Sequence, residues 1–351
     1  MRDSRVALPV LVLMTFVLSG YLSKAAAELR VSPRIKVREA YNDNIFLTAE
    51  NEEDDFITLV APGLNLGYDS RRLTASLDYQ MVYRFYAKHS DRNETDPKET
   101  QRATADASLT LYKDIAFVDA SDRYQRVTID VRGPVAEDNA LVNRTDSNYV
   151  RVNPYMEDYD RQTIFLGGDI ALRRLTLGGE VGWSRFDYEE RESMKSTVWS
   201  ASAKYLLSSL VTLTANYSKD FTESVTLGAV KTESITSSIE YAGKIPSTIT
   251  GFRNVYRYVL VDREDRETGA QVNWGIPISS RLQGGLLGRY AYYEFLPEGE
   301  KANRYSARGS IGYSLKVGEL SAVYTYNRND SGIDANDYVN NIVWAEARLE
   351  F

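Results

Sequence analysis

The last eleven residues, NIVWAEARLEF (341–351), alternate between two kinds of side chain. The first kind is apolar and consists of Val343, Ala345, Ala347, Leu349 and Phe351. The second kind is mostly charged and consists of Trp344, Glu346, Arg348 and Glu350. Alternate side chains of a β-strand point to opposite faces, so one face of this segment is apolar to its end. A strand with lipid on one face and water on the other has this pattern.

The same alternation recurs upstream. The clearest case is RLTASLDYQMVYRFY (72–86), in which Leu77 and Tyr79 share an apolar face while Asp78 and Arg84 share a polar one. Further alternating segments lie at 102–112, 210–218, 282–295 and 305–316. The chain contains 25 Tyr against 11 Phe and 4 Trp, and both strands and membrane interfaces favour Tyr.

The connections between these segments alternate in length. Short turns are expected near 70–72, 113–114, 173–174, 208–209, 243–247, 278–280 and 317–319. Longer polar loops are expected near 44–53, 88–99, 127–148, 188–195, 221–228, 262–267, 296–303 and 329–337. Fifteen connections predict an all-β fold, a transmembrane antiparallel β-barrel of about 16 strands, with 161–172 as a strand and 147–158 as its extension or part of the loop. The competing interpretation is a secreted β-sandwich or β-helix.

Residues 1–27 have the character of a secretory signal peptide. Two Arg precede an apolar run, and small residues ending at Ala27 offer a cleavage site. The barrel would then occupy 28–351 as one domain in the cell outer membrane. Removing residues 1–27 takes away three basic residues and one acidic residue, so the net charge falls from −7 to −9. That charge argues against a nucleic-acid partner, since phosphate binding needs a basic surface.

Residues that could support catalysis or metal binding are scarce. The chain has no Cys and a single His, His89, in a polar loop, where a solvated role is favoured over a catalytic or metal-binding one. The sequence therefore predicts no enzyme, no cofactor and no metal site. Acidic runs such as 50–55 and 329–337 are expected to be solvated outer loops, with divalent-cation binding as the alternative.

Charged residues occupy many positions on the predicted inner faces of the strands. The predicted pore lining consists of Asp78, Arg84, Arg102, Asp106, Glu180, Lys204, Arg253, Arg257, Arg289, Arg308, Glu346 and Arg348, and Asp119, Arg123 and Glu240 are further inward candidates. Two interpretations stay open: a lining that selects solutes, or charges that pair along the wall. Only the C-terminal third shows one dominant sign, through Arg253, Arg257, Arg289 and Arg308.

The first hairpin, at 38–72, contains Tyr41-Asn42-Asp43-Asn44, then Asp54-Asp55, then Ala61-Pro62-Gly63-Leu64. It resembles the opening of the β-barrel porins encoded with exosortase (PEP-CTERM) and exopolysaccharide gene clusters in Gram-negative bacteria. The resemblance covers about a tenth of the chain. It implies a location and a pathway, and it supplies no catalytic residue.

Two functions are compatible with these observations. The first is a channel or conduit, with exopolysaccharide export as the expected role. The second is a structural or binding barrel with a closed lumen that holds surface polysaccharide or partner proteins. The expected partners are outer-membrane lipid and lipopolysaccharide, the barrel-assembly machinery and, for export, periplasmic polysaccharide-export proteins and exopolysaccharide.

Overall fold

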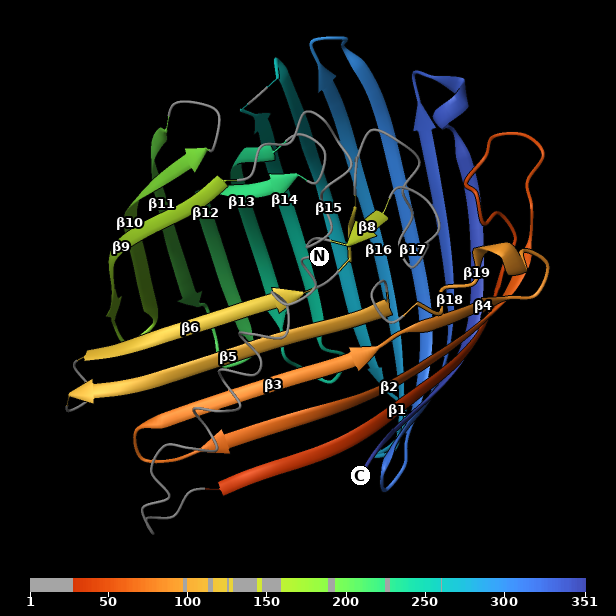
Figure 1. Ribbon diagram of the computed structural model, residues 1–351, viewed down its shortest axis with the longest axis horizontal. Coiled ribbons are helices and arrows are strands. Elements are labelled where there is room, and N and C mark those ends of the chain that lie inside the picture. Colours follow the sequence, from red (N-terminus) through yellow and green to blue (C-terminus); the bar gives the residue numbers. More distant parts are fainter. Residues whose placement is uncertain are drawn as a thin grey trace, which may run out of the picture.

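The computed structural model describes residues 28–96, 100–112, 116–124, 126–128, 144–146, 159–188, 193–224, 228–259 and 261–351. It is built from β-strands (Figure 1). No helix in these ranges is long and apolar enough to cross a membrane. The expected signal peptide at 1–27 and the segment 147–158 lie outside the described residues.

The strands of the first half are β1 (Glu28–Asn42), β2 (Asp55–Asp69), β3 (Leu73–Met81), β4 (Tyr83–Tyr86), β5 (Gln101–Tyr112), β6 (Ala116–Tyr124), β7 (Arg126–Thr128), β8 (Arg144–Asp146) and β9 (Tyr159–Ala171). Those of the second half are β10 (Leu175–Tyr188), β11 (Met194–Leu206), β12 (Val211–Ser224), β13 (Gly228–Tyr241), β14 (Ser247–Tyr258), β15 (Arg263–Pro277), β16 (Leu282–Leu296), β17 (Glu300–Ser314), β18 (Gly318–Ser331) and β19 (Tyr338–Glu350). Two 3₁₀ turns, η1 (Ser90–Arg92) and η2 (Asp334–Asn336), lie in loops.

One antiparallel sheet contains 17 of these strands, and β7 and β8 pair separately. Only Val82 separates β3 from β4, so the two are halves of one crossing strand and the sheet has the 16 antiparallel strands that the sequence predicts. Neighbours in the chain pair with each other, and β1 pairs with both β2 and β19. The wall therefore curves, with β1 to β6 crossing in front of β9 to β19 (Figure 1).

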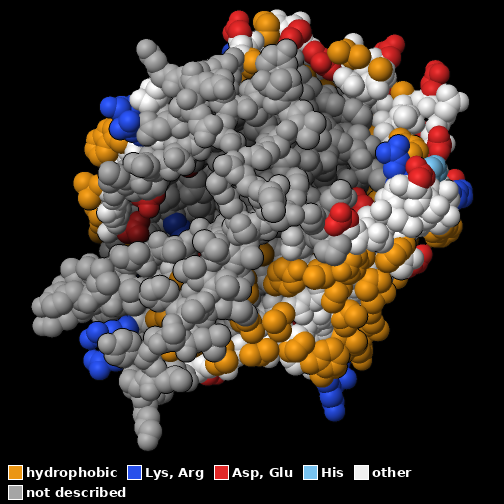
Figure 2. All heavy atoms as spheres, viewed as in Figure 1, with side chains coloured by type: hydrophobic (Ala, Val, Ile, Leu, Met, Phe, Trp, Pro, Cys, Tyr) orange, Lys and Arg blue, Asp and Glu red, His pale blue; other side chains and the backbone are white. Residues whose placement is uncertain are grey.

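Side-chain alternation gives this wall two different faces. On β19, Val343 is 50% exposed on the outer face, whereas Trp344 is 6% exposed on the inner face. Ile235, Ile239, Ile249 and Leu286 are likewise exposed on the outer face. Hydrophobic side chains form a broad patch over the front strands, and charged side chains gather at the upper edge (Figure 2). Such a banded outer surface suits a lipid environment.

Among the described residues, the expected short turns and the longer loops fall at opposite edges of the wall, since consecutive strands pair as antiparallel hairpins. Several loops are shorter than the sequence predicts, because the strands continue past the apolar band. Near the predicted loops at 221–228, 262–267 and 296–303, β12 ends at Ser224 and β13 begins at Gly228, β15 begins at Arg263, and β16 ends at Leu296 before β17 begins at Glu300. Buried apolar side chains form small inner clusters, such as Ala291 with Phe295 and Ala40 with Trp344.

Candidate pore lining

The strand register shows which predicted lining residues lie on the inner face. Ten of the twelve do: Asp78, Arg84, Arg102, Asp106, Glu180, Lys204, Arg289, Arg308, Glu346 and Arg348. Glu240 also lies on the inner face. The side chains of Asp119 and Arg123 lie outside the described part of the chain.

The prediction was wrong for Arg253 and Arg257. Both share the face of β14 that carries exposed Ile249, opposite the inner Phe252. Arg257 pairs with Glu233 at 2.9 Å and Glu264 at 2.6 Å, both on the outer face. The physical reason is that β13 to β15 extend beyond the apolar band, where the outward positions also become charged. A one-sign basic cluster on the inner wall therefore loses two of its four expected members.

Ion pairs tie much of the inner wall together. Arg34 of β1 pairs with Asp78, and Arg38 pairs with Glu346 at 2.8 Å. The ring of Trp344 contacts two guanidinium groups, with Arg38 4.6 Å and Arg308 5.6 Å from its centroid. These cation–π contacts link β1, β17 and β19.

Glu267 of β15 is the centre of a second inner network. It is 4% exposed and pairs with Arg289. It also accepts hydrogen bonds from the hydroxyl of Tyr293 at 2.6 Å and from Asn254 at 2.7 Å. The cation and these donors compensate the carboxylate for its lost hydration. The sequence did not identify Glu267 as an inner residue, because 262–267 was predicted to be a loop. The alternation of side chains through Arg266, Glu267 and Thr268 could have indicated a strand there.

The inner face of β9 to β13 is different. Asp169, Glu180, Lys204 and Glu240 are exposed there, and many of the other inner residues are small or hydroxylated. None of the following inner residues of β11 to β13 is buried: Ser200, Ser202, Thr212, Thr214, Asn216, Ser234, Thr236 and Ser238. Thr248 and Thr250 of the adjoining β14 are not buried either. Their register places them side by side, with Asn216 opposite Thr236 and Thr214 opposite Ser238. This hydroxyl-lined sector is exposed to solvent and carries scattered charges of both signs.

The Tyr41-Asn42-Asp43-Asn44 motif holds the β1–β19 junction at the loop edge. Asn340 is fully buried and donates to Asn42 Oδ1 and, at 3.0 Å, to the carbonyl oxygen of Asn44. Asn44 in turn donates to the Val339 carbonyl at 3.0 Å, and Asn341 donates to Asp43 at 2.7 Å. The motif is therefore explained by hydrogen bonds that join the first strand to the last one.

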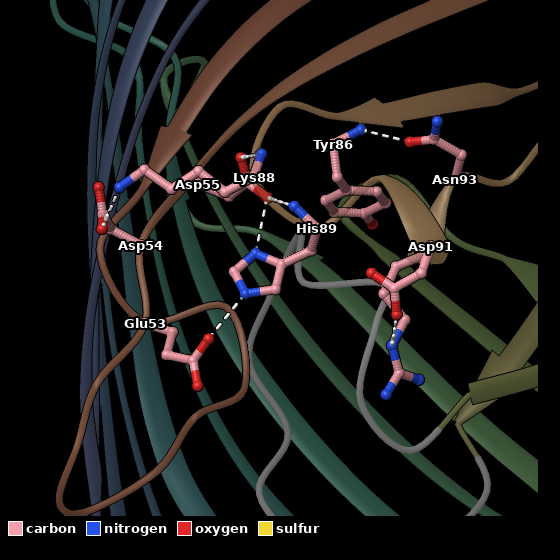
Figure 3. A network of polar contacts seen from close by, with 9 residues as sticks. Glu53, Asp54, Asp55, Tyr86, Lys88, His89, Asp91 and Asn93 are labelled. Carbon is pink, nitrogen blue, oxygen red and sulfur yellow. Dashed lines mark hydrogen bonds and ion pairs between the residues drawn. The ribbon is translucent and has the colours of Figure 1, made fainter.

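His89 has a structural place in the outer loops (Figure 3). Its Nδ1 lies 2.9 Å from buried Asp55, and its Nε2 lies 2.7 Å from Glu53. The backbone N–H groups of Lys88 and His89 also donate to Asp55. Hydrogen bonds to Asp55 and then to Glu53 raise the pKa of His89 above its ordinary 6.5. With both ring nitrogens facing carboxylates, the protonated imidazole is the form that fits. The ring joins two loops.

Nothing in the described residues brings three His, Asp or Glu side chains together as metal ligands. In the acidic 329–337 loop, Asp337 instead accepts a hydrogen bond from the Ser331 backbone N–H.

Comparison with solved structures identifies the fold. The chain is similar to the outer membrane channel DcaP of Acinetobacter baumannii, with a TM-score of 0.52 and 12% identity over 95% of this chain and 99% of that one. An anion-selective porin from Comamonas acidovorans aligns with a TM-score of 0.49 and 13% identity, over 93% of this chain and all of that one. No protein family matches the sequence, and no curated protein does.

Proposed function

We propose that this porin-like outer-membrane β-barrel is a channel whose water-filled path runs along the hydroxyl-lined sector of β9 to β13. The supporting observation is that Glu180 and Lys204 are exposed although both lie on the inner face. A wall of 16 strands is too wide for its own side chains to fill. Solute would meet hydroxyl groups and isolated charges on this side, and ion-paired wall on the other.

Within that proposal, the cargo is an exopolysaccharide leaving the cell. Weak, repeated hydrogen bonds from Ser, Thr and Asn suit a sugar polymer that must slide without being trapped. The resemblance of the 38–72 hairpin to porins of exosortase and exopolysaccharide clusters supports the same cargo. Periplasmic polysaccharide-export proteins would deliver the polymer to the turn edge of the wall.

Planar-bilayer recording tests the channel. The purified full-length protein should give discrete conductance steps, and long neutral oligosaccharides added to one side should interrupt the current. Deleting the gene should lower surface exopolysaccharide while intracellular synthesis continues. A protein that carries current while the deletion leaves surface polysaccharide unchanged would retain the channel and remove the polysaccharide cargo.

The alternative is a structural or binding barrel with a closed lumen. The ion pairs and buried polar side chains of β14 to β19 and β1 favour it, because they stabilise a wall without leaving charges for solute. Under this alternative the folded protein shows no conductance in bilayers, and its outer loops hold surface polysaccharide or partner proteins.

A further inference from the structure

The outer face of β12 to β14 carries cations just above the apolar band. Four residues, here called the outer basic patch, are Lys219, Lys231, Arg253 and Arg257. On β13 the outward residues change from exposed Ile239 and Ile235 to Glu233 and Lys231 towards the loop edge. On β14 the change is from exposed Ile249 to Arg253 and Arg257. The outer basic patch therefore begins at the height where the acyl chains of the lipid would meet the headgroups.

The register places like charges side by side. Lys231 is the cross-strand partner of Arg257, and Lys219 lies opposite Glu233 on the neighbouring strand. Like charges in directly opposite positions repel and destabilise a sheet. A nearby anion would remove that penalty.

Local carboxylates are already engaged by arginines. Glu233 and Glu264 pair with Arg257, and Glu264 also pairs with Arg266 at 2.6 Å. Within the described ranges, Lys219, Lys231 and Arg253 make no ion pair within 4.0 Å. Among the side chains that the structure describes on the outer face of β12 to β14, four cations accompany one carboxylate, Glu233. Glu264 of the neighbouring β15 also pairs with Arg257, and the side chain of Glu223, at an outward position of β12, lies outside the described residues.

We infer that the outer basic patch binds a phosphate group of an outer-leaflet glycolipid. Phosphate accepts charge-assisted hydrogen bonds from both ammonium and guanidinium groups. The apolar residues directly below the patch offer a surface for the acyl chains of the same molecule. A free phosphate ion would satisfy the cations and leave that second surface unused, so the arrangement favours a lipid.

The test uses the folded full-length protein in detergent and measures lipid binding by native mass spectrometry. The probes are bis-phosphorylated lipid A and the same lipid after removal of both phosphates. The test variant combines Lys219→Gln, Lys231→Gln and Arg253→Gln. The control variant combines Lys244→Gln and Lys316→Gln, which removes exposed cations at the turn edge. Heat-modifiable migration on gels verifies folding, and Lys231→Gln alone serves if the triple variant fails to fold.

Phosphorylated lipid A should bind the natural protein about tenfold or more tightly than the dephosphorylated lipid, and the triple variant should lose that preference. The control variant should keep it. Equal binding of both lipids, or an unchanged preference in the triple variant, would overturn the assignment. So would displacement of the lipid by millimolar inorganic phosphate, since that outcome indicates a site for a free anion.

Discussion

Asn340 illustrates how one buried side chain supports the junction between distant strands. It has no exposed surface, and it bonds Asn42 and Asn44 of the first strand region while accepting a hydrogen bond from Asn327 on β18 at 3.4 Å. Such a group holds its neighbours because its own buried amide must find hydrogen-bond partners among them.

Asn340→Ala should therefore lower the free energy of unfolding by about 1–3 kcal/mol, because it removes two buried hydrogen bonds, to Asn42 and Asn44, each worth roughly 0.5–1.5 kcal/mol. Urea titration of the folded barrel in detergent measures the change. Asn216→Ala is the matched control, since Asn216 is exposed and makes one 3.4 Å hydrogen bond, to Thr236. Equal destabilisation by the two variants would contradict the role given to Asn340.

His89 is the single histidine of the chain, so its imidazole gives an unambiguous NMR titration. Bonding to Asp55 and Glu53 raises its pKa, so the titration midpoint should lie above 6.5, and Glu53→Gln should lower it. Because the folded pKa is raised, the loop contacts are complete below the unfolded value and weaken as pH rises through the folded value. Protease cleavage in 44–53 should increase over that interval. Asp91→Asn, outside the His89 contacts, should leave the midpoint unchanged.

At the scale of the strand, the register of 72–86 can be tested by moving a charge one position. Leu77 lies opposite Leu66 on the outer face, and Ser76 lies opposite Asp106 on the inner one. Leu77→Arg should cost about 2–4 kcal/mol at mid-membrane depth, whereas Ser76→Arg gains an acidic neighbour and should be mild. The effect of each substitution is measured as the amount of folded, heat-modifiable barrel in outer-membrane fractions. Similar losses from both changes would refute the register.

Alternation explains which elements could be predicted from the sequence. Between the two membrane surfaces, water and lipid impose opposite demands on neighbouring residues, and strands such as 72–86 and 341–351 show it directly. Above the apolar band both faces meet water, so that contrast disappears. Arg253 and Arg257 were therefore predicted on the inner face, but they lie on the outer face. The exposed Ile249, nearer the middle of the membrane on β14, is an even number of residues away from both and lies on that same outer face. Glu267 was hidden for the same reason, and the contacts of Asn340 depend on a partner strand about 300 residues away.

At the scale of the whole wall, exposed charges lie on the inner face of β9 to β13, so each of them should contribute to ion preference. Glu180→Gln should shift the reversal potential in a salt gradient towards anions, and Lys204→Gln should shift it towards cations, because both side chains face the water-filled side. Arg253→Gln is the control, since Arg253 lies on the outer face and should leave the reversal potential unchanged. An effect of Arg253→Gln as large as that of Lys204→Gln would contradict both placements.

The pairing of β1 with β19 also has a consequence for the order of events in biogenesis. Its register joins Arg34 to Glu350 and Asn42 to Ile342, so this ladder waits for the final residues to arrive. Until then one side of β1 offers unpaired backbone groups, a template for pairing with other chains. Contacts between such distant positions also form slowly, since a long loop must be closed first. The sheet can therefore close only when the last strand is in place, and before that the free edge of β1 favours pairing with other chains.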